Sequence, residues 1–409
     1  MKRASTARKG EIAMKRIKQI AKYAAYMMTV VIVLSMSFEA AAFDSTMSNA
    51  ARVMAESAQM TLNSNSACLI EPSTGQVLYE YNADERYEPA SVTKVMTLLL
   101  IMEALDDGTI SLTDTVTASM YAASMGGSQI WLEYGEQLPV DEMLIAIVGV
   151  SANACSVAMA EHLAGSEENF VARMNERAAE LGMVNTTFKN CTGLPVEGHL
   201  TTARDIALMT CELLKHEKIF DYTTIWMDSL RGGAMGLSNT NKLIRFYPGA
   251  TGMKTGYTSS AGYCLSATAA RDGMSLVATM MKAKTSAERF ADAKKLLDYG
   301  FANYSVYKCD DTAVEPIAVK GGKEEYLNLS YGGCSVLLPK GREKKVETIL
   351  ELPEYVSAPI NKGDVIGKAH FVIDKEEIAT RDIVAAEGVE RLGVFDIFDK
   401  IFKKLMLFR

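Results

Sequence analysis

Two residues three positions apart, Ser91 and Lys94, have the side chains and the spacing of a nucleophile and its base. A helix beginning near Pro89 would place both on one face, because residues at i and i+3 are neighbours there. The segment that follows is apolar on every face, which predicts a buried helix. Burial and the positive end of the helix dipole both favour the neutral amine, which can accept a proton. The same spacing recurs at Ser305 and Lys308 without an apolar helix after it, so we interpret that pair as a solvated segment.

Two further short motifs lie downstream and carry groups that could act on the same substrate. Ser151 and Asn153 form a Ser-x-Asn motif between two apolar stretches, where a loop could aim both side chains into a cleft. The alternative is that both are helix N-caps. Lys254, Thr255 and Gly256 enter a predicted strand, where a cation and a hydroxyl could hold a carboxylate. The alternative there is a polar strand start with a turn glycine.

The order and spacing of the three motifs are more informative than each motif alone. Ser-x-x-Lys, Ser-x-Asn and Lys-Thr-Gly follow one another as in penicillin-binding proteins and class A β-lactamases. Longer stretches, among them EPASVTKVMT, MNERAAELGMVNTTFKNCTGLP and GATGMKTGYTSSAGYC, resemble the low-molecular-weight penicillin-binding proteins that are D-alanyl-D-alanine carboxypeptidases. The resemblance is strong over residues 60–305 and looser beyond. Ala152 and Tyr257 stand where relatives vary, and neither departure removes a reacting group.

The resemblance implies a role for each residue that would react. Ser91 would attack the carbonyl between the two terminal D-alanines of a peptidoglycan stem peptide, and Lys94 would accept its proton. Ser151 would relay a proton to the departing D-alanine, while Asn153 would orient Lys94 and the substrate amide. Water would then hydrolyse the acyl-enzyme, so neither a metal nor a cofactor is expected. Penicillins and other β-lactams would acylate Ser91 as covalent inhibitors.

The resemblance also implies how the substrate is held. Lys254 and Thr255, with Gly256 beside them, would bind the terminal carboxylate, and the backbone N–H groups of Ser91 and Tyr257 would form the oxyanion hole. Arg289 matches a family arginine near that carboxylate. The alternative for Arg289 is an ordinary solvated arginine on a helix.

Two other functions share parts of this pattern. A β-lactamase has the same three motifs but also needs a deacylating glutamate between the second and the third, and we find no convincing Glu-x-x-Leu-Asn there. A non-catalytic sensor of β-lactams or wall peptides would bind without turnover. Release of free D-alanine from a peptide, compared with fast release of penicillin, separates the three possibilities.

The order of strand and helix patterns indicates the fold class. Residues 66–82 are typical of two strands around a turn, and residues 261–281 of a hairpin. Residues 103–220 are mostly helical, and residues 285–304 return to helix. This order predicts an α+β fold, an antiparallel sheet covered by helices like that of β-lactamases and DD-peptidases, over residues 43–305.

Residues 306–388 have a different sequence pattern and are expected to form a small all-β C-terminal domain. Short β-type runs there are separated by Gly-Gly, Pro-Lys-Gly and Asn-Lys-Gly turns. The segment carries no catalytic motif, so we assign it only a spacing or partner role.

The N-terminus is typical of a secretory signal peptide of residues 1–42. Eight basic residues among the first 22 precede an apolar run and an Ala-Ala-Ala site. The alternative is an uncleaved anchor, although the apolar run is shorter than the roughly 20 residues that span a bilayer. We therefore expect a secreted protein at the outer face of the cytoplasmic membrane, on the cell-wall side.

Charge and rare residues exclude several classes of function. Residues 1–42 carry eight basic and two acidic groups, so without them the net charge of −7 becomes −13, which does not suit nucleic acid. Seven cysteines without Cys-x-x-Cys argue against a disulfide framework or a zinc site. The four histidines form no His-Glu-x-x-His motif, so no metal site is expected.

The C-terminal segment, residues 389–409, is predicted to form an amphipathic helix that binds a membrane surface. Between Val394 and Phe408, nine apolar residues fall within one half of a helical wheel, and three lysines and two aspartates fill the other half. The alternative is a terminal helix docked on the β domain.

Overall fold

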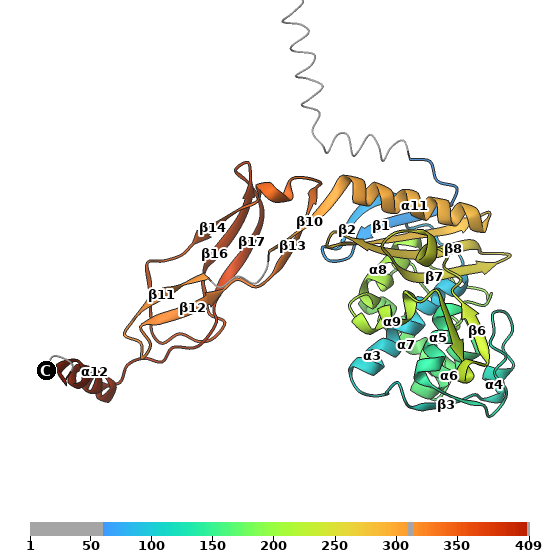
Figure 1. The fold of residues 1–409 in the computed structure, drawn as a ribbon, viewed down its shortest axis with the longest axis horizontal. Coiled ribbons are helices and arrows are strands. Elements are labelled where there is room, and N and C mark those ends of the chain that lie inside the picture. Colours follow the sequence, from blue (N-terminus) through green and yellow to red (C-terminus); the bar gives the residue numbers. More distant parts are fainter. Residues whose placement is uncertain (1–59, 310–313, 407–409) are drawn as a thin grey trace, which may run out of the picture. The chain divides into compact units, whose positions relative to one another are not determined.

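The computed structural model describes residues 60–309 and 314–406, so the expected signal peptide lies outside the described residues. A five-stranded antiparallel sheet in the order β2-β1-β9-β8-β7 forms the centre of the N-terminal part (Figure 1). Its strands are β1 (Ser66–Glu71), β2 (Gln76–Tyr81), β7 (Ala250–Thr258), β8 (Gly262–Arg271) and β9 (Met274–Ala283). Both predicted hairpins are therefore confirmed.

Helices cover both faces of this sheet. On one face lies α11 (Ser286–Asn303), which begins with a capping box between Thr285 and Glu288 (Figure 1). The other face carries a helical cluster that contacts the sheet through α8. The longer helices of that cluster are α3 (Lys94–Asp106), α5 (Val140–Gly149), α6 (Asn153–Ala164), α7 (Glu167–Glu180) and α8 (Ala203–Leu213). Because both faces are covered, β1 is buried along its whole length. The predicted α+β class is confirmed.

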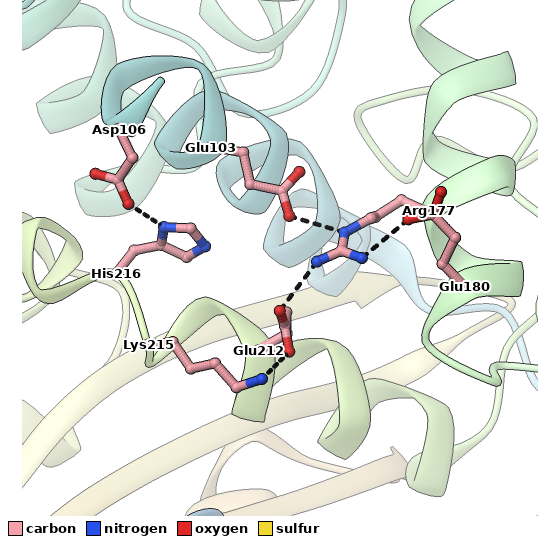
Figure 2. A network of polar contacts seen from close by, with 7 residues as sticks. All are labelled: Glu103, Asp106, Arg177, Glu180, Glu212, Lys215 and His216. Atoms are coloured by element: carbon pink, nitrogen blue, oxygen red, sulfur yellow. Dashed lines mark hydrogen bonds and ion pairs between the residues drawn. The ribbon is translucent and has the colours of Figure 1, made fainter. Parts of the chain in front are cut away.

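The far end of α3 is held by ion pairs. Figure 2 shows Arg177 of α7 between Glu103 of α3, at 2.8 Å, and Glu212 of α8, at 2.9 Å. Nearby, His216 Nδ1 lies 2.6 Å from the carboxylate of Asp106 at the last turn of α3. These side chains are partly exposed, so each pair contributes little stability alone. Their geometric effect is that α3 is fixed against two other helices.

Shorter elements complete this part of the chain. They are the 3₁₀ turns η1 (Ala90–Thr93), η2 (Glu217–Ile219) and η3 (Arg231–Gly233), the helices α4 (Met120–Ala123), α9 (Phe220–Thr223) and α10 (Leu243–Phe246), and the strand pairs β3 (Thr115–Thr117) with β4 (Gln137–Pro139) and β5 (Met227–Leu230) with β6 (Met235–Ser238).

The predicted all-β domain is also confirmed. Its strands are β10 (Tyr304–Cys309), β11 (Val314–Lys320), β12 (Tyr326–Ser330), β13 (Cys334–Pro339), β14 (Glu347–Glu351), β15 (Tyr355–Ser357), β16 (Val365–Ile373) and β17 (Glu376–Ala385), with the 3₁₀ turn η4 (Glu343–Lys345) between β13 and β14. Six of them form the sheet β14-β16-β17-β12-β11-β15, and β10 pairs with β13. They enclose a hydrophobic core of their own.

The first strand of this domain, β10, carries one half of a disulfide and the second Ser-x-x-Lys spacing. Cys309 and Cys334 are directly opposite in the β10–β13 pair and form a disulfide, a single bond that the cysteine pattern did not predict. Ser305 and Lys308 lie on the same strand. Residues three apart on a strand point to opposite faces, so this second Ser-x-x-Lys does not form a nucleophile and base pair.

The C-terminal helix α12 (Val394–Met406) exists as predicted. Several of its apolar side chains are solvent-exposed, with Phe395 at 91% and Phe398 at 71%. Across residues 60–309 and 314–406, no helix is both long enough and apolar enough to cross a bilayer.

Candidate active site

Ser91 and Lys94 lie side by side at the start of α3. The expected helix begins as the 3₁₀ turn η1, which carries Ser91, and Lys94 is the first residue of the α-helix proper. Lys94 Nζ lies 3.2 Å from Ser91 Oγ. Ala90, just before the serine, has a left-handed backbone with φ of 49°. Such conformations persist where the surrounding structure holds them, and they are frequent at functional sites.

The Lys94 amine is fully buried and has an unusual protonation equilibrium. Burial lowers its pKa to about 7, because removal from water penalises the charged form. Lys94 Nζ donates to Asn153 Oδ1 at 2.6 Å and to the carbonyl oxygen of Thr192 at 2.7 Å. Near pH 7, a large share of the molecules therefore carries a neutral amine directly beside the Ser91 hydroxyl.

Ser151 and Asn153 do not cap a helix. The N-cap of α6 is Ala152 without a side-chain hydrogen bond, so the capping alternative is wrong. Asn153 donates from Nδ2 to the carbonyl oxygen of Gly126 at 2.7 Å and accepts the Lys94 bond at its other side-chain atom. Ser151 has a φ of 64°, and its buried Oγ has no hydrogen-bond partner among the described residues. This hydroxyl is therefore free to bond with a substrate.

Lys254, Thr255 and Gly256 lie in the middle of β7, which is an edge strand of the sheet. They are not at its start, so the strand-start alternative does not hold. The buried Lys254 Nζ donates to the Thr255 carbonyl at 3.1 Å. Burial, and then the charges of Lys94 and Arg289, hold the pKa of Lys254 well below its usual range. Three basic side chains therefore gather here, and an anion bound among them would favour their charged forms.

Gly256 brings the third motif into contact with the first. A Cβ atom at this position would lie 2.8 Å from the carbonyl oxygen of Pro89, 3.1 Å from the Ser91 nitrogen and 3.0 Å from the Val92 nitrogen. Any larger residue would push β7 away from the turn that carries Ser91. Because Gly256 has no side chain, the backbones of β7 and η1 can pack directly against each other.

Arg289 lies behind β7 and is buried, with 7% of its surface exposed. The solvated interpretation is therefore wrong. Its Nη1 donates to the carbonyl oxygens of Gly256 at 2.8 Å and Cys264 at 3.2 Å, and burial lowers its pKa to about 10. Tyr257 is 54% exposed, and its ring stacks on Tyr263 at 4.3 Å between centroids. Arg289 thus braces the backbone on which the third motif is built.

Backbone groups of the loop after α7 were not predicted as part of the site. The Thr192 carbonyl binds Lys94, and a Cβ atom at Gly193 would lie 1.8 Å from the Ala90 carbonyl oxygen. Asn190 shapes this loop, because its Oδ1 accepts from the backbone nitrogens of Thr192 at 3.2 Å and Gly193 at 2.7 Å. An Asn-x-x-Gly pattern is a turn signal, so the turn, although not its role, could have been predicted.

The side chains of Thr240 and His199 support the motifs and were not predicted as part of the site. Thr255 Oγ1 donates to Thr240 Oγ1 at 2.8 Å. His199 Nδ1 accepts from the Lys189 backbone nitrogen, so its Nε2 carries the proton and donates to Thr93 Oγ1 at 2.8 Å. Burial lowers the pKa of His199 to about 4, which keeps this bond in place at neutral pH.

The described residues contain no group of three or more His, Cys, Asp or Glu side chains arranged to hold a metal ion. The side chains gathered at the site are a hydroxyl at Ser91, an amine at Lys94 and the hydrogen-bonding groups of the second and third motifs.

Comparisons with known proteins identify the family of this chain. A sequence model of the D-alanyl-D-alanine carboxypeptidase family matches residues 52–285, and one of the penicillin-binding protein 5 C-terminal domain matches residues 301–391. D-alanyl-D-alanine carboxypeptidase DacF of Bacillus subtilis is 46% identical over 343 residues, which is 82% of this chain and 88% of that protein.

Solved structures give the same result. Penicillin-binding protein 5 of Haemophilus influenzae has a TM-score of 0.70 and 30% identity, covering 81% of this chain and 99% of its own. Penicillin-binding protein D2 of Listeria monocytogenes in its ampicillin-bound form has a TM-score of 0.52 and 31% identity, covering 59% and 99%. Because the family model matches more than half of this chain, the chain belongs to the D-alanyl-D-alanine carboxypeptidase family of serine hydrolases.

Proposed function

We propose that Ser91 is the nucleophile and Lys94 the general base with which this D-Ala-D-Ala carboxypeptidase removes the terminal D-alanine of peptidoglycan stem peptides. The observation that carries the proposal is the 3.2 Å contact between Ser91 Oγ and a fully buried amine whose pKa is lowered to about 7. A base with a pKa near the working pH combines the correct protonation state with a useful driving force for proton transfer.

Acylation follows from these positions. Ser91 Oγ attacks the carbonyl carbon of the penultimate D-alanine, and Lys94 Nζ takes the hydroxyl proton. The backbone N–H groups of Ser91 and Tyr257 stabilise the negative oxygen that forms. The bond to the terminal D-alanine nitrogen then breaks, and Ser151 relays the proton held by Lys94 to that nitrogen, so free D-alanine leaves and Lys94 is neutral again. The unpartnered Ser151 Oγ supports this role.

Deacylation returns the enzyme to its starting state. Water attacks the ester carbon and gives one proton to Lys94, which passes it to Ser91 Oγ as the ester bond breaks, so the shortened peptide leaves and Ser91 regains its hydroxyl. A β-lactam follows the same first step, but its leaving nitrogen stays attached to the acyl group and blocks the path of water. Covalent β-lactam binding is a property of this family, and the ampicillin-bound Listeria relative is one example.

The terminal carboxylate of the substrate is held on the β7 side. Lys254 and Thr255 supply a cation and a hydroxyl there, and Gly256 lets the peptide approach the strand backbone. Arg289 contributes its charge and braces β7 through the Gly256 carbonyl. Binding of a carboxylate next to Lys254 also favours the charged form of this buried amine, whose pKa is lowered by burial.

The assay is release of free D-alanine from a stem pentapeptide that ends in D-Ala-D-Ala. The peptide with a C-terminal L-alanine and the Ser91→Ala variant are the controls, and neither should release alanine. Rapid turnover of penicillin without D-alanine release would instead indicate a β-lactamase. Binding of both compounds without any product would indicate a sensor.

We also infer that the enzyme acts outside the cytoplasmic membrane and binds its surface through α12. Extracytoplasmic action is consistent with the cell-wall role of the family, and residues 1–42 supply a signal-peptide pattern. Exposed apolar side chains on α12, such as Phe395 and Phe398, support a helix lying in the interface. Deletion of residues 390–409 should release the protein from anionic vesicles and leave peptide hydrolysis intact. Undiminished vesicle binding, or unfolding of the truncated protein, would refute the anchor.

A further inference from the structure

A loop between α4 and β4, residues 126–136, lies directly against Asn153. The carbonyl oxygen of Gly126 accepts from Asn153 Nδ2 at 2.7 Å, and that of Ser128 accepts from the Asn153 backbone nitrogen at 2.9 Å. A Cβ atom at Gly127 would lie 2.8 Å from Asn153 Nδ2, so the backbone touches the amide. These contacts decide which way the amide faces. They turn its Oδ1 toward Lys94, at 2.6 Å.

The same loop is held from the opposite side by one arginine. Arg231 Nη1 donates to the Ile130 carbonyl at 3.1 Å, and Nη2 donates to the Trp131 carbonyl at 3.4 Å. Its Nε and Nη2 bind the Glu136 carboxylate at 2.7 and 3.2 Å, and Nη1 also reaches Met235 Sδ at 3.2 Å. A guanidinium has five N–H donors in a fixed fork, and these contacts use the whole fork.

Arg231 and Trp131, at the two ends of this contact, both have a left-handed backbone conformation. Arg231 lies on η3, the turn of the β5–β6 hairpin, with a φ of 55°, and its backbone nitrogen donates to Glu142 of α5 at 2.9 Å. Trp131 has a φ of 56° although its side chain is 78% exposed. A bulky residue keeps a left-handed backbone only where its surroundings impose it. Ile130 and Leu132, on either side of Trp131, are buried, and Arg231 binds the Ile130 and Trp131 carbonyls, so buried side chains and the guanidinium together hold this stretch of backbone.

We propose that Arg231 is a positioning residue for acyl transfer, acting through residues 126–131 on Asn153 and so on Lys94. The proposal rests on the roles of Ser91 and Lys94 argued above. Without the guanidinium, the Ile130 and Trp131 carbonyls lose their donors and the loop relaxes. The Asn153 amide is then no longer fixed, and Lys94 Nζ is held less well beside the nucleophile.

The test compares second-order rate constants for acylation by a fluorescent penicillin. Arg231→Ala should lower the constant roughly 10- to 100-fold, because small displacements of reacting groups cost that much. Arg231→Lys should recover little, since an ammonium cannot reproduce the fork. Arg204→Ala is the matched control: its side chain is 28% exposed against 27% for Arg231, and it pairs with Glu80 and Asp84. It should acylate at the wild-type rate.

A second comparison separates positioning from general stability. In an Asn153→Ala background, assayed with long incubations, Arg231→Ala should cause no further loss, because the residue through which it acts is gone. An equal loss in both backgrounds, or a wild-type rate for Arg231→Ala, overturns the proposal. If Arg231→Ala does not fold, Arg231→Lys carries both comparisons. Labelling that survives in Ser91→Ala would instead refute the proposed function, so the two failures are distinguishable.

Discussion

Replacing Lys94 with methionine should change how the stability of this protein depends on pH. The folded protein lowers the pKa of the buried amine from 10.5 to about 7. Between these two pH values the unfolded chain binds a proton that the folded chain does not, so the free energy of unfolding rises with pH. The penalty for burying this amine is therefore absent above pH 10.5, grows as the pH falls from 10.5 to 7, and is complete below 7.

The size of the Lys94 pKa shift determines how much the free energy of unfolding changes with pH. A difference of about 3.5 pKa units corresponds to about 5 kcal/mol over the whole window. Between pH 7 and pH 9.5, allowing for partial protonation at both ends, the wild-type protein should gain about 3 kcal/mol relative to Lys94→Met. Loss of the bonds to Asn153 and Thr192 also changes the stability of the variant, but that loss does not depend on pH in this range.

The assay is urea unfolding of the wild-type protein and of Lys94→Met at pH 7, 8 and 9.5. The quantity of interest is the difference between the two free energies of unfolding, because titrating groups that do not interact with Lys94 cancel in it. Lys284→Met removes one charge from an exposed lysine and serves as the control. If the wild-type minus Lys94→Met difference stays constant between pH 7 and pH 9.5, the Lys94 amine is not neutralised by burial, and the assignment of the base is wrong.

Three further predictions concern activity. Because the neutral amine is required, acylation by penicillin should fall about tenfold per pH unit below pH 7, and stopped-flow or gel labelling across pH 5–9 checks this; a flat profile would contradict it. Lys94→Arg keeps the charge but supplies no neutral base, so acylation should fall by orders of magnitude at every pH, and a near-normal rate would mean that another group is the base. Gly256→Ala should separate β7 from η1 and slow acylation roughly a hundredfold in the same labelling assay, whereas Gly236→Ala, which meets no atom within 4 Å, should not; equal rates for the two variants would show that the close approach at Gly256 does not matter.

Much of the site could be predicted because its residues conflict with their surroundings. Lys94 stands out in the sequence as a cation at the start of an apolar helix, and the structure shows it fully buried there. The order of elements likewise predicted the antiparallel sheet, because strand and helix patterns have different hydrophobic periods.

The rest depends on tertiary contacts that leave little trace in the sequence. The sequence alone does not show whether Arg289 is solvated or buried, because its burial results from the packing of β7 and β8 against α11. The Thr192 carbonyl binds Lys94 through the backbone, and every residue has a carbonyl. The bond between Cys309 and Cys334 follows from the register of two strands, which cysteine spacing alone does not give.

The central claim, that Ser91 is the acylated nucleophile beside a neutral Lys94, is tested most directly by locating the covalent adduct. After brief exposure to benzylpenicillin, the protein is quenched in acid, digested and analysed by tandem mass spectrometry. A mass increase equal to one whole penicillin should lie on Ser91, because ring opening adds the inhibitor without losing an atom. An adduct on Ser151 or on another residue, or no adduct on protein that is folded and releases D-alanine, would contradict the account.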